Sequence, residues 1–204
     1  MARPVARRTI ENAIRRLGFA RVAGVDEVGR GCLAGPVVTA AVILDPARHI
    51  AGVRDSKLLT PAARERLCAD IVDAAVGWRV AWAAPDVIDR LNIHNATLRA
   101  MREAVMALVP LPDFVLVDGF RIPGLEVPQR RVVGGDRRCA AIAAASIVAK
   151  VTRDRHMQAL HAQDPRYGFD RHKGYATAAH LGAVWRHGYS TAHRRSFRPR
   201  SLGR

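Results

Sequence analysis

The feature that most restricts the fold of this chain is an Ala-rich stretch that runs from Cys139 to about His161. Its composition favours a long helix that is apolar on most of its faces, and we expect such a helix to be buried by other elements. Short apolar segments rich in β-branched residues are typical of strands. These segments are 20–26, 36–44, 78–83, 114–117 and 131–133. Strands that come first and then alternate with helices predict an α/β fold, with one central mixed β-sheet flanked by helices.

Local signals place further helices between and around the strands. Thr60 and Pro61, followed by Glu65, have the pattern of an N-cap, a first-turn proline and an early acidic residue, so a helix is expected to about Ala75. Pro85 begins a second, short helix. The other expected helices are an amphipathic one over 4–18, a periodic one over 93–108 and one near 177–187.

The chain has no internal repeat and no low-complexity linker, so we predict a single domain over residues 1–204. Its core is expected over about 20–165 and a small basic helical C-terminal extension over about 166–204. No stretch approaches the ~18 consecutive apolar residues that a membrane span needs. The Arg-rich start also lacks the apolar core of a signal peptide. We therefore expect a cytoplasmic protein without a membrane partner.

The three cysteines, Cys32, Cys68 and Cys139, are widely spaced and odd in number. Disulfide frameworks and zinc knuckles need closely spaced pairs, so the sequence predicts neither of them. We interpret the three side chains as small, buried apolar groups.

The formal net charge of +15 is concentrated at the two ends of the chain. Residues 1–21 contain six Arg and one Glu, and residues 171–204 contain seven Arg and one Lys but no acidic residue. Two basic ends favour a polyanionic partner such as nucleic acid, because neutralising phosphates releases counterions and raises affinity. The alternative is a solvated surface that reflects a general preference for Arg, since the chain has 30 Arg and only 3 Lys.

Two adjacent acids, Asp26 and Glu27, come at the end of the first expected strand and before a Gly-rich turn. Neighbouring residues of a strand point to opposite faces, so one acid should face the core unless the turn redirects it. A buried carboxylate needs a metal ion or a basic partner. The glycines around Arg30 allow the backbone to approach a phosphate or a base, and Arg30 adds a planar, positively charged guanidinium group. The alternative is a strand-end turn with solvated acids.

Asp118 and Asp136 also follow expected strands. Asp136 comes just before the long Ala-rich helix and, taken alone, has the pattern of its N-cap. Ligands of α/β sheets gather at the carboxyl ends of strands, so the acids of three strand ends are expected to converge on one cleft. Their mutual repulsion favours hard divalent cations such as Mg²⁺, which prefer oxygen ligands. An acidic pocket in a basic protein is what metal-assisted phosphodiester hydrolysis requires, with two cations ~4 Å apart.

Seven blocks of the sequence follow one another in an order that is typical of a known enzyme family. They are DEVGRG at 26–31 with its continuation to residue 44, DSK at 55–57, LNIHNATLRAM at 91–101, VDG at 117–119, GD at 135–136, AAASIVAKVTRD at 143–154 and YGFDRHKGYAT at 167–177. In order and spacing this arrangement resembles ribonuclease HII, the type 2 ribonuclease H family. The resemblance runs from about Val22 to Phe197. It implies a ribonuclease H-like fold.

The resemblance also implies a set of metal-binding catalytic carboxylates and a cofactor. The cofactor would be two divalent cations, Mg²⁺ or Mn²⁺, bound together with the substrate. The implied ligands are Asp26, Glu27, Asp118 and Asp136.

A loop and a tyrosine are implied to select RNA over DNA. In the family, the backbone of the loop that here is Gly29, Arg30 and Gly31 grips the nucleotide around the scissile phosphate and senses the ribose 2′-hydroxyl. That hydroxyl is the group that separates RNA from DNA. Tyr175 would stack near the RNA–DNA junction; without the resemblance, core packing would be the expected role of this ring.

Lys57, Ser146 and Lys150 match family positions near the bound nucleic-acid backbone. All three lysines of the chain, Lys173 included, fall inside the recognised blocks, although Arg is ten times as frequent. A compact ammonium differs from a guanidinium fork, so these positions favour Lys specifically. For Ser146 and Lys150 the alternative is packing on a buried helix, with an i,i+4 pair between Lys150 and Asp154.

Two positions depart from the family pattern. Gly134 stands where the family often has Lys before the Gly-Asp pair, and Leu58 stands where a second Lys commonly follows DSK. Neither residue is an implied metal ligand, so we expect changed substrate affinity or salt dependence rather than lost chemistry. His94 and His172 are candidate proton shuttles, but a structural role is the more common one for such histidines.

The implied enzyme is an endonuclease that cuts on the 5′ side of a ribonucleotide and leaves 3′-hydroxyl and 5′-phosphate ends. Its substrates would be RNA–DNA hybrids and single ribonucleotides in duplex DNA, and its role would be the removal of misincorporated ribonucleotides and primers. One alternative is a type 3 ribonuclease H that acts on hybrid tracts only. Another is a non-catalytic basic nucleic-acid-binding module, which four acids would oppose. We expect a monomer, and a sliding clamp as a partner through the tail near Ser196 and Phe197.

Overall fold

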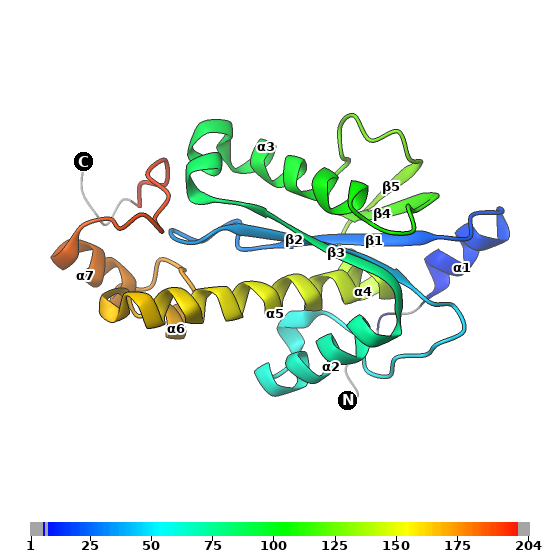
Figure 1. Cartoon of the computed structure of the whole chain (residues 1–204), viewed down its shortest axis with the longest axis horizontal. Helices are drawn as coiled ribbons and strands as arrows, with labels where there is room; N and C mark the ends of the chain where they lie inside the picture. The colour runs from blue at the N-terminus through cyan, green and yellow to red at the C-terminus, as the bar shows by residue number, and fades with distance from the viewer. Residues whose placement is uncertain (1–5, 7, 200–204) are drawn as a thin grey trace.

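The protein is described by a computed structural model over residue 6 and residues 8–199. Five strands form one sheet in the order β3-β2-β1-β4-β5 (Figure 1). They are β1 (Val22–Val28), β2 (Val37–Leu44), β3 (Ala75–Ala83), β4 (Phe114–Asp118) and β5 (Gln129–Val132). The β3-β2-β1 part is antiparallel, and β1, β4 and β5 are parallel, so the sheet is mixed. This confirms the predicted fold class.

Helices cover both faces of the sheet. Figure 1 shows α3 on one face and α5 with α2 on the other. The α-helices are α1 (Thr9–Arg16), α2 (Pro61–Ala74), α3 (Pro85–Met106), α4 (Gly135–Arg138), α5 (Ala140–Gln163), α6 (Phe169–His172) and α7 (Ala178–His187). Two short 3₁₀ helices are η1 (Ser56–Leu58) and η2 (Pro165–Tyr167). None of the helices in the described residues has the length and apolar character of a membrane span.

The central strands bury both faces because their residues alternate between two cores. In β2, Val38, Ala40 and Val42 belong to the core on the α5 side, whereas Ala41 and Ile43 belong to the core on the α3 side. The Ala-rich first half of α5, residues 140–149, is buried throughout against the sheet, as its composition predicts, whereas the second half buries only one face. Small side chains let the helix backbone approach the sheet, and each side chain buried in this way stabilises the fold by roughly 1 kcal/mol or more.

The helix signals read from the sequence mark real boundaries. The Thr60 side chain accepts a hydrogen bond from the Ala63 N–H at 3.2 Å, as an N-cap does. Within α3, Asn92 leaves helical geometry with φ 64° and ψ 163°. Its side chain accepts from the N–H groups of His94 and Asn95, both at 3.0 Å, and so begins the second half of α3. The two helices predicted at Pro85 and at 93–108 are therefore present, joined by a kink.

Several element boundaries differ from the predictions. β3 begins at Ala75, directly after α2, because its first residues already pair with β2. β5 covers Gln129–Val132 rather than 131–133. The first helix is α1, Thr9–Arg16, and the start of its predicted range over 4–18 lies partly outside the described residues. The three cysteines are free and buried, as interpreted.

The C-terminal part packs onto the end of α5 and onto the loop between β1 and β2. Tyr167, Phe169 and Val184 form a third apolar cluster with Leu33 and Met157. Within it, the His180 ring stacks on His172 with centroids 4.3 Å apart, and its Nε2 lies 3.1 Å from the Nε2 of His193. The extension that the sequence predicts at 166–204 is thus in contact with the main core in its described residues.

The buried histidine pair gives a prediction about protonation. Burial lowers the pKa of His180 to about 4 and that of His193 to about 4. The ordinary histidine pKa is about 6.5, so between these values the unfolded chain binds protons that the folded chain does not. The stability that this pair contributes is therefore fully present above about pH 6.5 and is lost as the pH falls towards about 4. An NMR titration of the imidazole rings measures this directly, and a midpoint near 6.5 for either ring would contradict it.

Candidate active site

Two of the predicted acids lie at the end of β1, beside the end of β4. Val25 of β1 is paired with Val117 of β4 in the parallel ladder, so Asp26 and Asp118 follow at the same level of two neighbouring strands. Asp26 is 5% exposed, and the Glu27 side chain is 13% exposed. The interpretation of Asp26 and Glu27 as solvated turn residues is therefore wrong, because β1 continues through both of them.

The other two acids, Asp118 and Asp136, lie at the end of β4 and shortly after the end of β5. Asp118 ends β4, and its Oδ1 accepts a hydrogen bond from the Gly135 N–H at 2.7 Å. Gly134 has left-handed geometry with φ +61°, which a glycine adopts without strain, and it turns the chain into α4. Asp136 lies in this short helix and is 5% exposed. The turn thus places Asp136 next to Asp118.

Asp136 is not the N-cap of the long helix, which corrects the interpretation of this residue taken alone. The residue that precedes α5 is Cys139, and it makes no side-chain capping bond. The reason is α4, which inserts a separate helical turn between Asp136 and α5. A short helix that begins at a left-handed glycine leaves no apolar periodicity by which the sequence could show it.

The acids raise one another's pKa. Burial raises the pKa of Asp26 well above its usual range, and the charges of Glu27 and Asp118 raise it further. Burial also raises the pKa of Glu27, and the Asp118 charge adds to this against the opposing Arg30. Burial and the Asp136 charge raise the pKa of Asp118 despite its hydrogen bond from Gly135. The positive charges of Arg30 and Lys57 therefore offset the burial and mutual repulsion of these acids only in part.

Divalent cations fit this cluster. The buried Oε2 of Glu27 has no hydrogen-bond partner among the described residues. Two basic groups pair with acids at the edge of the cluster: Arg30 Nη1 is 3.6 Å from Glu27 Oε1, and Lys57 Nζ is 3.4 Å from Asp136 Oδ2. Within the described residues, no three His, Cys, Asp or Glu side chains already surround one cation position. Mg²⁺ commonly uses one or two carboxylates and takes its other ligands from water and substrate phosphates.

The loop after β1 presents its outer side to solvent. Gly29 has φ +90°, and a Cβ there would lie 2.2 Å from Arg153 Nε, so no larger residue fits. The Arg30 guanidinium lies 4.5 Å from the centroid of the Phe120 ring. Gly31 is exposed, and nothing lies within 4 Å of the Cβ it lacks. A ligand can therefore approach the backbone of this loop from outside.

The turn that contains Lys57 is connected to α4 by an ion pair. Asp55 accepts a hydrogen bond from the Lys57 N–H at 2.9 Å and lies 3.2 Å from Arg137 Nε. The Lys57 side chain is 77% exposed while its Nζ lies near Asp136. Desolvation would lower the Lys57 pKa, but the charges of Asp136 and Asp55 outweigh it and raise the pKa. This lysine is therefore a charged group at the edge of the acidic cluster.

A groove of 650 Å³ follows α5 from α2 to the segment before α7. Lys150 and Tyr175 both line it. Tyr175 is 46% exposed, so its interpretation as a core residue is wrong. Lys150 Nζ lies 2.7 Å from Asp154 Oδ1, which is the predicted i,i+4 pair. Ser146 lies beneath the surface, 6% exposed, with its hydroxyl 3.0 Å from that of Ser56.

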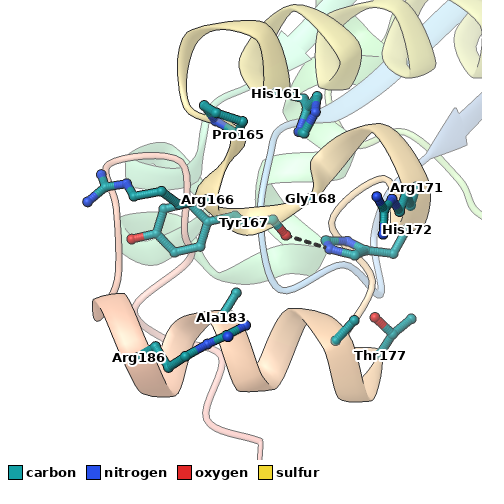
Figure 2. A pocket seen from close by; sticks show the side chains of 11 residues that line it. His161, Pro165, Arg166, Tyr167, Gly168, Arg171, His172, Thr177, Ala183 and Arg186 are labelled. Atoms are coloured by element: carbon teal, nitrogen blue, oxygen red, sulfur yellow. Dashed lines mark hydrogen bonds between the residues drawn. The ribbon is translucent and has the colours of Figure 1, made fainter.

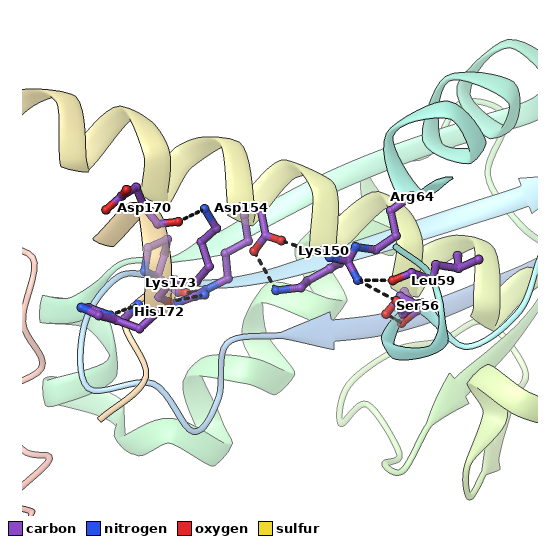
Figure 3. A network of polar contacts seen from close by, with 12 residues as sticks. Ser56, Leu59, Arg64, Lys150, Asp154, Asp170, His172 and Lys173 are labelled. Atoms are coloured by element: carbon purple, nitrogen blue, oxygen red, sulfur yellow. Dashed lines mark hydrogen bonds and ion pairs between the residues drawn. The ribbon is translucent and has the colours of Figure 1, made fainter. Parts of the chain in front are cut away.

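Sequence reasoning missed Arg64, which lies in this groove. Its Nη1 donates to the carbonyls of Ser56 and Leu59, at 2.9 and 3.0 Å, and its Nη2 is 4.0 Å from Asp154 (Figure 3). Arg64 therefore connects the turn before α2 with the Lys150–Asp154 pair. One arginine among many in a basic chain gives no signal, because only the tertiary contact distinguishes it.

The two candidate proton-shuttle histidines have structural contacts. His172 Nε2 lies 2.8 Å from the Tyr167 carbonyl, and its Nδ1 accepts from the Gly174 N–H at 3.2 Å. The His94 ring meets the Phe120 ring edge-on, with centroids 5.4 Å apart. These contacts agree with the structural role expected for both.

A second pocket, of 520 Å³, lies between η2, α6 and α7 (Figure 2). Arg166, Arg171 and Arg186 line it, and none of its lining residues is acidic. Arg166 pairs with Asp164 at 2.8 Å, outside the lining. None of the predicted metal ligands or substrate contacts lines this pocket, although His172 does. It is a basic hollow on the C-terminal part of the molecule.

Comparisons with known proteins identify relatives over most of the chain. A family model described as Ribonuclease HII matches residues 23–200. A protein named Ribonuclease HII from Azoarcus sp. (strain BH72) is 58% identical over 178 residues, which are 87% of this chain and 87% of that protein.

Solved structures share the fold. The crystal structure of the ribonuclease H2 from Pyrococcus horikoshii OT3 has a TM-score of 0.76 and 26% sequence identity, and the match covers 90% of this chain and 97% of that one. The structure of the PCNA:RNase HII complex from Archaeoglobus fulgidus gives a TM-score of 0.75 at 25% identity, over 88% of this chain and 96% of that one.

Proposed function

The chain belongs to the ribonuclease HII family, and we propose that it also incises duplex DNA on the 5′ side of a single embedded ribonucleotide. Family membership gives the coarser activity, that of a ribonuclease H that hydrolyses RNA in RNA–DNA hybrids. The observation that carries the finer proposal is the exposed backbone of Gly31, in the loop that follows β1 and its buried acid Asp26. A backbone contact beside the reacting phosphate can select one ribose.

We propose that the acidic cluster binds two divalent cations, Mg²⁺ or Mn²⁺. The raised pKa values of its buried acids and the unpartnered Glu27 Oε2 support this assignment. When bound, the cations supply positive charge at the scissile phosphate and favour ionisation of the attacking water. The chain's own residues hold this cluster in place through the Gly135 N–H and the ends of β1 and β4. The proposed ligands are Asp26, Glu27, Asp118 and Asp136.

We propose that a second group of residues binds the substrate. Gly29, Arg30 and Gly31 would contact the ribonucleotide through their backbone. Tyr175 would stack at the RNA–DNA junction, which its exposure at the groove permits. The other proposed contacts to the bound backbone are Lys57, Lys150 and, from beneath the groove, Ser146.

Basic residues away from the acids are proposed to hold the duplex. Residues 171–204 carry seven Arg and one Lys without an acidic residue, and Arg171 and Arg186 line one hollow together with the preceding Arg166. Phosphate contacts of this kind give affinity without base sequence preference. We therefore propose that the extension at about 166–204 positions the duplex, while the core at about 20–165 performs the chemistry.

One assay tests the proposed function against its alternatives. The purified chain is incubated with Mg²⁺ or Mn²⁺ and a duplex that contains one ribonucleotide, and in parallel with a long RNA–DNA hybrid. We expect a cut 5′ of the single ribonucleotide, with 3′-hydroxyl and 5′-phosphate ends, and cuts in the hybrid. Cuts in the hybrid alone would indicate the type 3 preference. Binding without cuts would indicate a non-catalytic module.

In the cell, we propose that the protein removes misincorporated ribonucleotides and primers. We also propose that it is a monomer and acts in the cytoplasm. A sliding clamp as partner has the support of one fold relative, which was solved as a complex with PCNA. In this chain Ser196 bonds to Asp89 and Phe197 packs on Arg194, so both residues are engaged within the chain.

A further inference from the structure

A buried arginine near the C-terminal end contacts the loop after β1. Arg194 is 0% exposed. Its guanidinium donates to three backbone carbonyls: Nη2 to Gly29 at 2.6 Å, Nη1 to Arg30 at 2.8 Å and Nε to Gly35 at 3.0 Å. Burial lowers the Arg194 pKa to about 10, so the group stays charged at neutral pH. A charged donor makes each of these bonds stronger than a neutral one would be.

The two carbonyl contacts fix the direction of two N–H groups. A trans peptide is planar, with its C=O and N–H pointing to opposite sides. Because the carbonyls of Gly29 and Arg30 point towards Arg194, the N–H groups of Arg30 and Gly31 point away from it. No hydrogen-bond partner within the described residues accepts from either N–H. Gly31 is exposed, so this side of the loop faces outwards.

The segment that carries Arg194 is itself firmly held. The Arg194 N–H donates to the Leu33 carbonyl at 3.0 Å, and Ala34 and His193 form a β-bridge. On the other side, Asp89 of α3 accepts from the N–H groups of Arg195 and Ser196, both at 2.9 Å. The Phe197 ring lies 5.0 Å from the guanidinium. Arg194 therefore has a fixed position relative to the loop.

We propose that Arg194 is a positioning residue for substrate selection: it orients the Gly29–Arg30 and Arg30–Gly31 peptides so that two adjacent N–H groups face the nucleotide. Its guanidinium touches neither substrate nor acids and acts through the loop backbone. Two outward N–H groups on successive residues suit an oxygen-bearing ligand such as a ribose hydroxyl or a phosphate. This inference rests on the proposed incision at ribonucleotides.

The test measures how strongly the protein prefers a ribonucleotide. Fluorescence anisotropy without divalent cations gives the Kd of a duplex with one ribonucleotide and the Kd of the same duplex in all-DNA form. The variant Arg194→Lys keeps the charge but loses the planar fork that reaches three carbonyls. The preference for the ribonucleotide is the all-DNA Kd divided by the single-ribonucleotide Kd. We expect this Kd ratio to fall about tenfold in the variant, while the all-DNA Kd stays nearly unchanged. With Mg²⁺ present, the change should fall mainly on KM for the single-ribonucleotide substrate.

Three further variants separate positioning from general stability. Val184→Ala removes buried apolar volume from the C-terminal apolar cluster but no hydrogen-bond donor to the Gly29 or Arg30 carbonyl, so it should lower Tm but keep the preference for the ribonucleotide duplex. Arg194→Met removes every donor, and should lose the preference completely where it folds. Phe197→Leu removes the ring beside the guanidinium and should give a smaller loss than Arg194→Lys.

The possible outcomes are distinct. The inference is overturned if Arg194→Lys has the same Kd ratio as the wild type. It is also overturned if the variant loses affinity for both duplexes equally. A wild type that cuts at ribonucleotides but binds both duplexes equally also overturns it, because the loop N–H groups then select nothing. A wild type that does not cut at a single ribonucleotide refutes the proposed function instead.

Discussion

Asp118→Asn is expected to reduce cleavage about 10³-fold or more while the protein stays folded and keeps its affinity for the duplex. Charge stabilisation by a bound cation is worth several kcal/mol in the transition state, and each 1.4 kcal/mol is a factor of ten in rate. Asp118 lies between the ends of β1 and β5, so its loss would affect the whole proposed cluster. Asn keeps an oxygen that can accept the bond from the Gly135 N–H, which lies at 2.7 Å from Asp118.

The stability of this variant should be equal to or above that of the wild type. Burial and the Asp136 charge raise the pKa of Asp118, so its ionised form is disfavoured in the folded chain. Removing the charge of Asp118 relieves its repulsion by Asp136. It also reduces the repulsion between this site and the phosphates of a bound duplex, which agrees with retained affinity.

Single-turnover cleavage with Mg²⁺, thermal unfolding and duplex affinity are the measurements. Asp73→Asn is a matched control, because the Asp73 side chain is 77% exposed and pairs only at the surface with Arg48. Wild-type turnover by Asp118→Asn would remove this residue from the proposed ligands. We expect the same pattern for Asp26→Asn, whose carboxyl is also buried.

Gly24→Ala is expected to destabilise the fold by about 3 kcal/mol or more, at the upper end of the range for overpacked cores. A Cβ at Gly24 would lie 2.1 Å from the Ala141 carbonyl carbon and 2.3 Å from the Ile142 nitrogen. Both are backbone atoms of α5, so no side-chain rotation relieves the clash. β1 and α5 would have to separate, and β1 carries Asp26.

Thermal unfolding should show a Tm lowered by about 10 °C, since 1 kcal/mol shifts Tm by 2–4 °C at this chain length. Gly182→Ala in α7 is the matched control, because nothing lies within 4 Å of the Cβ added there. A helix gains about 0.5–1 kcal/mol from this change, so its Tm should rise slightly. An unchanged Tm for Gly24→Ala would mean that α5 and β1 are not as closely packed as described.

Much of the fold was predictable because its signals are local. β2 could be predicted because eight successive residues combine β-branched and small apolar side chains. The cap at Thr60 and the break near Asn92 depend on side chains that bond to their own neighbours in sequence. Helix α4 was not predictable, because it follows a glycine in left-handed geometry, Gly134, and ends after one turn.

The candidate site also contains some residues that the sequence predicts and others that only the structure identifies. Asp26, Glu27 and Asp118 could be proposed from the residues, because acids at the ends of apolar strands are chemically conspicuous. Asp136 has the pattern of an N-cap when taken alone, and only the family resemblance added it to the proposed ligands. The exposure of Tyr175 could not be predicted from the residues alone, because an aromatic ring usually packs inside; only the family resemblance implied a ring at the surface. Arg64 and Arg194 were missed because each acts through backbone carbonyls, and a carbonyl has no signature in the sequence.

The sequence by itself determined the strand–helix order, the buried character of α5, the acids at three strand ends and, through its ordered blocks, the family. Only the tertiary structure decided that Asp136 lies beside Asp118 instead of capping α5, and that Arg194 holds the loop after β1. The physical reason is the range of the interactions. Periodicity and capping act between residues a few positions apart, whereas Arg194 and Gly29 meet across 165 positions, where only the completed fold brings a donor to its acceptor.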